Sequence, residues 1–277
     1  MKNFYLVLLT LLFTGIAFGQ KKEKIKGSKV VTLAQKEIGA FENLEVEDNI
    51  EVFLAKGAGQ SLEIEADDNL HDVIQTDING NTLRIYTNKD VSGFKKLSIR
   101  VTYMDNLKSI TAKHETVLNA LTDIELDTIA IKNFDYSKSF LNVKSKNFSL
   151  LMNDKAKAEL NLKADNATIE LSKNAELKAL IAAPNVKMDM YQKTIAIIEG
   201  DAAIARIRVD NNASFTGKKF TVKNMELVAE GYSVSNIMAT ETLSISANGK
   251  AETQVFGTPK IDLKSFSDSA ILYKKEQ

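Results

Sequence analysis

The chain has no cysteine, no tryptophan, and only two prolines and two histidines among its 277 residues. Without cysteine it has no disulfide, no thiolate metal site, no thiol nucleophile and no cysteine to carry a lipid anchor. Without tryptophan, and with an aromatic content of 7%, it has few platforms on which a carbohydrate-degrading enzyme would stack sugar rings. These absences exclude several common kinds of catalytic and metal site.

Arginine is scarce and the charges balance. Thirty-six basic residues are offset by thirty-six acidic ones, so no global field would attract nucleic acid. The arginines number four, too few for bidentate phosphate recognition to be the main function: Arg84, Arg100, Arg206 and Arg208. No nucleic-acid partner is therefore expected.

Motifs of catalysis are also missing. The two histidines, His71 and His114, have no partner at ligand spacing, and the chain has no nucleophile elbow, P-loop, dinucleotide fingerprint or metalloprotease helix. We expect both histidines to lie in turns, and the adjacent Asp67 and Asp68 to cap a turn rather than act as paired carboxylates. No catalytic residue, no metal and no cofactor is predicted, so the chain is not expected to be an enzyme.

The first residues have the pattern of a signal peptide. Lys2 supplies a positive start, residues 4–18 an apolar stretch, and Ala17-Phe18-Gly19 a cleavage signal, so we assign residues 1–19 to the signal. Residues 20–29 are charged and are predicted to be a flexible leader. The protein is therefore expected to be exported to the periplasm, the cell surface or the extracellular space, with no membrane span after cleavage.

Short apolar pairs recur through the C-terminal two-thirds of the chain. Within each pair the residues are two apart, so they point to the same face of a strand. From one pair to the next the step is 18 to 21 residues, and the single 21-residue step is interpreted as a loop insertion. The pairs are Ile129/Ile131, Phe148/Leu150, Ile169/Leu171, Met188/Met190, Ile207/Val209, Met225/Leu227, Leu243/Ile245 and Ile261/Leu263.

A second register is predicted to mark the other corner of each coil. Its members are 19 residues apart and follow residues suited to turns, such as Asn174, Asn212 and Gly231. They are Ala175, Thr194, Ala213, Tyr232 and Ala251.

A repeat of about 20 residues that carries short strands is typical of a solenoid. The sequence therefore predicts an all-β, right-handed parallel β-helix-like solenoid with coils of about 18–21 residues. We expect residues 30–277 to form a single domain, with a cap and the first strands in 30–104 and regular coils in 105–277. Residues 272–277 are expected to close the C-terminal end with charge.

The segment before the coils alternates with period two and contains turn signals. A single helical turn is expected after Asp67-Asp68-Asn69-Leu70, and Asn79-Gly80-Asn81 predicts a tight turn. The run from Gly27 to Ile85 resembles the opening of the putative auto-transporter adhesin, head GIN domain family. The matching residues are Val30-Val31-Thr32, Ile38-Gly39-Ala40-Phe41, Leu44, Val46, Ile50, Val52, Leu54, Leu62, Ile64, Ala66-Asp67, Asn69-Leu70, Ile74, Asn79-Gly80-Asn81, Leu83 and Ile85. The resemblance implies an exported β-helical protein of Bacteroidota.

Outward-facing residues of the apolar pairs form the best candidate surface. Stacking is predicted to place Glu170, Asp189, Arg208 and Glu226 in one column at about 5 Å spacing. Flanking residues complete a candidate binding site for an anionic or sugar ligand, formed by Lys187, Asp189, Tyr191, Arg206 and Arg208. The alternatives are a solvated face whose opposite charges pair, and a calcium site at Glu170 and Asp189.

Three functions remain open at this point. The first is a non-catalytic, adhesin-like binding or scaffold protein of the cell envelope, whose partner would be a glycan or another envelope protein. The second is a polysaccharide-binding or polysaccharide-degrading β-helix protein. The third is a purely structural spacer.

Overall fold

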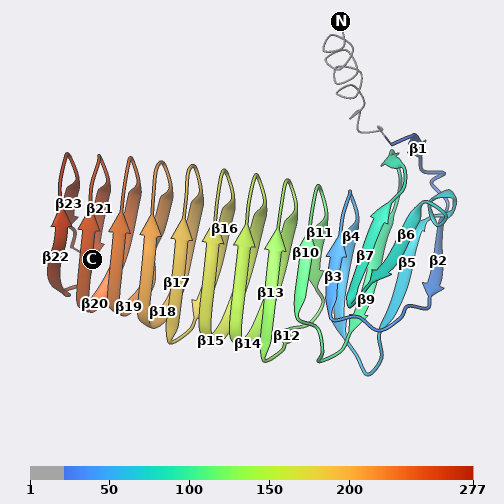
Figure 1. Ribbon diagram of the computed structural model, residues 1–277, viewed down its shortest axis with the longest axis horizontal. Coiled ribbons are helices and arrows are strands. Elements are labelled where there is room, and N and C mark those ends of the chain that lie inside the picture. Colours follow the sequence, from blue (N-terminus) through green and yellow to red (C-terminus); the bar gives the residue numbers. More distant parts are fainter. Residues whose placement is uncertain (1–21, 277) are drawn as a thin grey trace, which may run out of the picture.

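The computed structural model describes residues 22–276, which fold almost entirely into β-strands (Figure 1). The signal peptide predicted for residues 1–19 lies outside the described residues. The strands are stacked side by side along one long axis, with the N-terminal strands at one end and the red C-terminal strands at the other (Figure 1). This arrangement confirms the predicted all-β solenoid.

Two parallel sheets form the walls of the regular coils. Long strands bend in the middle, so the first half of each pairs in one sheet and the second half in the other. For example, residues 157–163 of one strand pair with Glu176–Ala182, and its residues 166–171 pair with Asn185–Met190. We call the sheet of first halves the A sheet and the sheet of second halves the B sheet.

The strands of these coils follow one another along the axis. They are β10 (Ser109–Ala112), β11 (Val117–Ala120), β12 (Ile124–Glu125), β13 (Thr128–Asn133), β14 (Lys138–Met152), β15 (Lys157–Leu171), β16 (Glu176–Ala182), β17 (Asn185–Met190), β18 (Ile195–Val209), β19 (Ser214–Ala229), β20 (Val234–Ala247), β21 (Glu252–Phe256), β22 (Lys260–Phe266) and β23 (Ile271–Lys274).

The core is a set of inward-facing columns that run from coil to coil. In the B sheet one such column is Leu150, Ile169, Met188, Ile207, Leu227, Ile245 and Leu263, in which each residue lies beside the next. Alternate residues point outward, so Ile207 and Val209 are buried whereas Arg206 is exposed, as predicted. Stacking buries the inward-facing columns of every coil except those at the two ends.

The predicted apolar pairs do not all occupy equivalent positions in their coils: some are displaced by two residues relative to the others. Phe148 lies beside Ala167, not beside Ile169, so the interpretation of the 21-residue step as a loop insertion is wrong. Each B-sheet segment has three inward positions, and at 167 and 205 the first of them is alanine. Because alanine gives little hydrophobic signal, the apolar pairs Ile169/Leu171 and Ile207/Val209 fall on the second and third inward positions of their segments.

The tight corners between the B sheet and the A sheet are built alike. In each, one residue has a positive φ angle, the left-handed region that glycine and asparagine enter most readily. These residues are His114, Asp135, Asp154, Lys173, Gln192, Asn211, Gly231, Gly249 and Asp268. A small buried residue follows two positions later, as at Ala175, Thr194 and Ala213. In the next coil the buried residue is Ser233, so the placement of Tyr232 in this column was wrong by one residue.

The N-terminal part closes one end of the stack with antiparallel strands. Its elements are β1 (Lys24–Lys26), β2 (Val31–Lys36), β3 (Asn43–Val46), β4 (Glu51–Lys56), β5 (Ser61–Asp67), the 3-10 turn η1 (Asp68–Leu70), β6 (Ile74–Asn79), β7 (Thr82–Thr87), β8 (Asp90–Ser92) and β9 (Leu97–Tyr103). Strands β2, β5 and β9 are antiparallel, and so is the hairpin of β6 and β7. The tight turn at Gly80 is confirmed. A single helical turn is present, but it lies at Asp68–Leu70 rather than after these residues, and Ile74 begins strand β6.

In this part the order of the strands along the stack differs from their order in the sequence. Strand β3 lies between β7 and β10, and β4 lies between β9 and β11. The coil of residues 43–56 is therefore sandwiched between two coils that come later in the sequence.

The C-terminal end is open within the described residues. Strand β23 pairs with β21 and β22 pairs with β20, and no strand of residues 22–276 covers their outer edges. Leu263 is consequently 52% exposed, although Ile245 beside it in the same column is fully buried. The expectation that residues 272–277 close this end was wrong, because β23 is itself part of the last coil.

Candidate functional site

The five residues predicted to form a binding face do lie together on the outside of the B sheet. Lys187 is beside Arg206 and Asp189 is beside Arg208, from β17 and β18 respectively. The guanidinium of Arg208 lies 5.9 Å from the ring centre of Tyr191. We call this surface the Arg206/Arg208 face.

The charges of the Arg206/Arg208 face are already engaged. Lys187 Nζ lies 3.0 Å from Asp189 Oδ2, and this hydrogen bond raises the pKa of Lys187. Arg206 Nε donates to Glu226 at 3.3 Å. Arg208 donates to a carboxylate oxygen of Glu230. Such exposed pairs contribute little stability, but they leave few free donors for a ligand.

The predicted column of four charges is corrected by the strand register. Glu170, Asp189 and Arg208 are neighbours as expected, but the next member of their column is Val228. Glu226 belongs to the adjacent column, beside Arg206. In the stretch 22–276, no three His, Asp or Glu side chains are grouped as a metal site would require, so the calcium alternative has no geometric support.

Asp67 and the two histidines make contacts that belong to the fold itself. Asp67 is buried and its carboxylate accepts hydrogen bonds from the backbone N–H groups of Lys29, Lys95 and Lys96, at 2.8 to 3.1 Å. Burial alone would raise the pKa of Asp67, but these hydrogen bonds outweigh it and lower the pKa. His71 Nε2 lies 2.9 Å from Thr32 Oγ1, and His114 occupies a corner. Asp67 therefore anchors the leader to the cap.

A second buried carboxylate, that of Glu47, stabilises the sandwiched coil of residues 43–56. Glu47 accepts from Arg84 Nη2 at 2.8 Å and from Lys113 Nζ at 3.2 Å, and these residues come from strands on either side of it. Burial opposes ionisation, yet these hydrogen bonds lower the pKa of Glu47 to about 2. The pair of cations thus ties the sandwiched coil to both neighbours.

A groove follows the bends of the long strands and was not predicted from the sequence. It has a volume of about 810 Å³ and runs across six successive coils. Its lining residues are Lys144, Ser145, Lys146, Lys163, Ala164, Asp165, Ala182, Ala183, Pro184, Asp201, Ala202, Ala203, Thr221, Lys223 and Thr240. We call it the bend groove.

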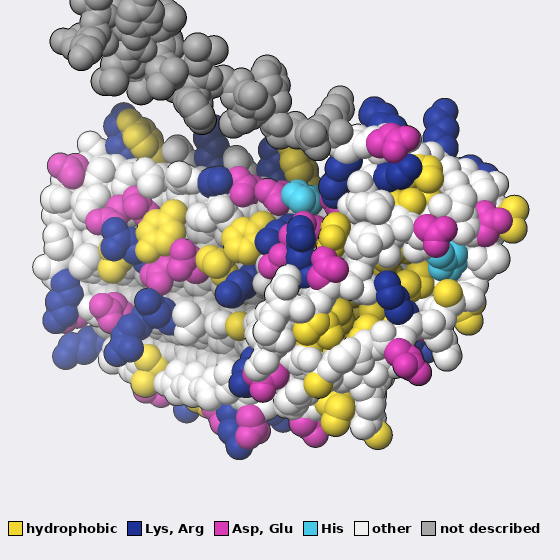
Figure 2. All heavy atoms as spheres, turned by 45° about the vertical axis from the view of Figure 1, so that its right-hand side comes forward, with side chains coloured by type: hydrophobic (Ala, Val, Ile, Leu, Met, Phe, Trp, Pro, Cys, Tyr) yellow, Lys and Arg dark blue, Asp and Glu magenta, His cyan; other side chains and the backbone are white. Residues whose placement is uncertain are grey.

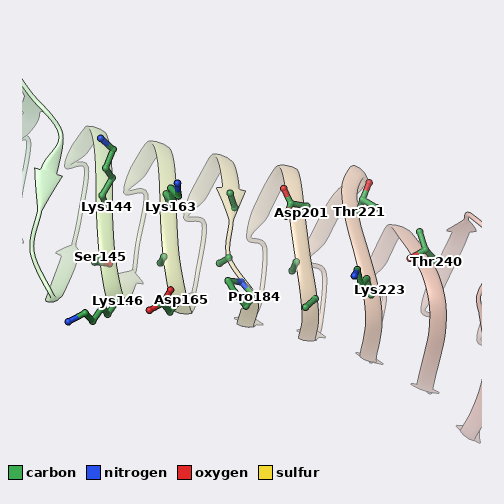
Figure 3. A pocket seen from close by; sticks show the side chains of 15 residues that line it. Lys144, Ser145, Lys146, Lys163, Asp165, Pro184, Asp201, Thr221, Lys223 and Thr240 are labelled. Carbon is green, nitrogen blue, oxygen red and sulfur yellow. The ribbon is translucent and has the colours of Figure 1, made fainter.

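Two rails of side chains border the bend groove (Figure 3). The first rail carries Lys144, Lys163, Asp201 and Thr221, and the second carries Lys146, Asp165, Pro184 and Lys223 (Figure 3). Between the rails the inward-facing residue is alanine at three successive bends, where Ala164, Ala183 and Ala202 are buried, and valine at the next, Val222.

The charges in the bend groove differ in whether they have partners. Lys144 pairs with Asp123 at 2.7 Å, and Lys146 pairs with Asp127 at 3.1 Å. Among the described residues, none forms a hydrogen bond or ion pair with the side chains of Lys163, Asp165, Asp201 or Lys223. The hydroxyl of Ser145 is also buried without a partner in this part of the chain.

Charge elsewhere on the surface is mixed. Figure 2 shows basic and acidic side chains interspersed on the face turned to the viewer, without a large area of one sign. Charged side chains of the described residues pair between adjacent coils, as Lys157 does with Glu176 at 2.9 Å and Lys219 with Glu199 at 3.1 Å. Long-range steering of a charged partner should therefore be weak.

A family model described as "Putative auto-transporter adhesin, head GIN domain" matches residues 40–259. A search of curated proteins finds no match. No helix in residues 22–276 is long and apolar enough to cross a membrane.

Several solved structures are similar in fold. A putative adhesin from Parabacteroides merdae is 17% identical with a TM-score of 0.61, and the alignment covers 91% of this chain and 99% of the other. A putative lipid binding protein from Parabacteroides distasonis is 16% identical with a TM-score of 0.70, covering 91% and 100%. A putative adhesin from the same species is 15% identical with a TM-score of 0.60, covering 92% and 98%. At these identities the likeness shows the fold alone.

Proposed function

Because this chain belongs to the putative auto-transporter adhesin, head GIN domain family, we propose that it is an exported, non-enzymatic binding protein of the cell envelope. The observation that carries the proposal is the pairing of surface charges between stacked coils. Ionised side chains such as Lys157 and Glu176 neutralise one another along the outer faces. General acid–base catalysis needs the opposite, a titratable group held beside a substrate with its pKa adjusted to the task.

The stacked architecture supports this function physically. Each coil contacts only its neighbours, and backbone hydrogen bonds between parallel strands hold a long, regular surface. A repetitive surface of this kind can make many weak contacts with an extended or repetitive partner at once. Linked weak contacts give a high overall affinity without any single strong site.

The Arg206/Arg208 face is proposed as one contact surface of this protein. Its support is the clustering of two arginines, Lys187 and Tyr191 on adjacent strands. A ligand would have to compete with Asp189, Glu226 and Glu230 for these cations, so binding there should be weak and sensitive to salt.

Three exposed apolar side chains on the A sheet, each beside a charged residue of the neighbouring strand, support a second candidate function, the binding of lipid surfaces. Leu180, Ile195 and Ile197 are 50%, 45% and 39% exposed. They come from the neighbouring strands β16 and β18. One structure of similar fold is described as a putative lipid binding protein, which is the reason to test this area.

The proposed function is tested with beads coated with the mature protein. We expect the beads to adhere to at least one of three surfaces: immobilised polysaccharides, host cell layers or lipid bilayers. The purified protein should release no product from any polysaccharide in the panel. Turnover of any polysaccharide would contradict the non-enzymatic assignment. Absence of adherence to every surface by a correctly folded protein would favour a structural spacer.

Export is tested on the native host. Protein recovered from the periplasm, the cell surface or the medium should lack residues 1–19. Recovery of the intact chain from the cytoplasm alone would contradict export.

A further inference from the structure

The bend groove offers free hydrogen-bonding groups on three of its six coils, those of β15, β18 and β19. Lys163 and Lys223 each carry three ammonium donors, and Asp165 and Asp201 carry acceptor oxygens; none of these side chains is engaged within residues 22–276. The hydroxyl of Ser145 is buried in the inward-facing column of the bends and is not among these groups. In its free charges the groove differs from the Arg206/Arg208 face, where the corresponding charges are paired.

The shape of the groove selects an extended ligand. Lys144, Lys163, Ala182, Asp201 and Thr221 are each beside the next across successive strands, so the rail runs along the solenoid axis. Strands in a sheet lie about 4.8 Å apart, so the six coils that line the groove extend over roughly 24 Å. This length suits a chain of several monomer units lying across the strands better than one small molecule.

The charges of the groove select an uncharged, hydroxyl-rich chain. The unpaired side chains are two cations and two anions, and each rail carries one of each: Lys163 and Asp201 on the first, Lys223 and Asp165 on the second (Figure 3). A polyanion would be repelled by the two carboxylates and a polycation by the two ammonium groups. A sugar hydroxyl can accept from an ammonium group and donate to a carboxylate, so it can use both kinds of group.

We propose that the bend groove binds a neutral polysaccharide chain that lies along the solenoid axis between the two rails. This inference rests on the proposed function of the protein as a binding protein and names a ligand class and a site for it. Ala164, Ala183 and Ala202 point inward between the rails, so the polysaccharide can approach the backbone there, and the rails contact it from both sides. Charge-assisted hydrogen bonds carry the affinity, because the groove has no aromatic side chain on which a sugar ring could stack.

The test uses purified mature protein and a panel of named polymers. Mannan, dextran and xylan are the neutral probes, alginate is the polyanion and chitosan is the polycation. One variant removes the free charges of the first rail, Lys163→Ala/Asp201→Ala, and another removes those of the second rail, Asp165→Ala/Lys223→Ala. The control, Lys157→Ala/Glu176→Ala, removes one cation and one anion that pair on the A sheet. Every variant leaves the net charge unchanged, and thermal melting checks that each is folded.

At least one neutral polysaccharide should bind the wild-type protein and the control with equal affinity. Each rail variant should bind it at least tenfold more weakly. Binding should change by less than about threefold between 50 and 500 mM salt, because few counterions are released when the ligand is neutral.

Three results would overturn the proposal. One is that no neutral polysaccharide binds; another is that one binds but ignores both rail variants; a third is that only alginate or chitosan binds. The bead assay separates these failures from a failure of the proposed function. If rail-variant beads adhere as strongly as wild-type beads, the groove is not the binding site but the proposed function stands. If wild-type beads adhere to nothing, the proposed function itself is wrong.

Discussion

Substitution of Ile207 tests the inward and outward assignment of the coils most simply. Ile207 is 2% exposed and lies beside Met188 in one neighbouring coil and Leu227 in the other, so its side chain is packed within a continuous column. The control is Arg206, the adjacent residue, whose side chain is 70% exposed and pairs with Glu226. The two residues differ in face but share a strand.

The expected magnitudes differ clearly. Ile207→Ala loses the burial of the removed methyl groups and leaves a cavity, which should lower the free energy of unfolding by about 2–5 kcal/mol. Ile207→Asp should cost more, because it buries a carboxylate without a partner. Arg206→Ala removes an exposed ion pair, which should cost less than about 1 kcal/mol.

Thermal melting followed by far-UV circular dichroism measures the difference. For a chain of this size, each kcal/mol shifts the melting temperature by roughly 2–4 °C. Ile207→Ala should therefore melt about 4–20 °C below the wild type, and Arg206→Ala within about 4 °C of it. Equal losses for the two variants would refute the assignment of faces.

Three further predictions concern the corner threonines, the buried Glu47 and the Arg206/Arg208 face. Thr194→Val should raise the melting temperature by a few degrees, because the Thr194 hydroxyl is buried without a partner in the described chain. Thr116→Val should lower the melting temperature, because the single hydroxyl proton of Thr116 is donated to the carbonyl of Asp48 at 3.0 Å, with that of Val46 at 3.3 Å. The reverse order would contradict the corner geometry. Glu47 has a folded pKa of about 2, below the unfolded value of about 4.3, so its contribution is complete above pH 4.3 and is lost as the pH falls toward 2. Denaturant midpoints measured across this range should fall less for Glu47→Gln than for the wild type, and parallel curves would show that Glu47 has no such role. Any polyanion that binds the Arg206/Arg208 face should bind less tightly as salt rises and in the Arg206→Ala/Arg208→Ala variant, and insensitivity to both would exclude that face.

The solenoid itself could be predicted because its core pattern is local. In a parallel stack, every coil must present alternate residues inward, so short alternating stretches recur at the length of one coil. The pattern at Ile207 and Val209 was predicted correctly for this reason. The family resemblance, drawn from residues between Gly27 and Ile85, is likewise confirmed by the match over residues 40–259.

The sequence predictions are wrong where contacts with neighbouring coils determine which residues are buried and which backbone conformation they adopt. Small inward residues such as Ala167 and Ser233 are buried by stacking, not by their own hydrophobicity, so the sequence gives little sign of them. Lys173 and Gln192 adopt positive φ without being glycine or asparagine, because hydrogen bonds along the corners hold each coil to the next. The sandwiched position of residues 43–56 depends on pairing between distant strands, which no local pattern encodes.

In the candidate sites, too, features that follow from the repeat length could be predicted and features that depend on contacts between coils could not. Adjacency of Lys187 and Arg206 follows from a constant repeat length, and it was predicted. Pairing of Arg208 with Glu230 depends on side-chain reach across a corner, and it was not. The bend groove depends on where the long strands bend. Its only signal in the sequence is a short break in the alternation near Ser145 and Ala183, where alanines and charged residues gather.

The most direct test of a binding surface that runs along the coils is a lysine footprint of the protein with its neutral polysaccharide bound. Acetylation rates are measured by mass spectrometry at Lys163 and Lys223 in the groove and at Lys157, about 20 Å from Lys163 along β15. We expect the polysaccharide to slow acetylation of both groove lysines at least several-fold and to leave Lys157 unchanged. Protection of Lys157 with no protection of Lys163 or Lys223 would contradict the account.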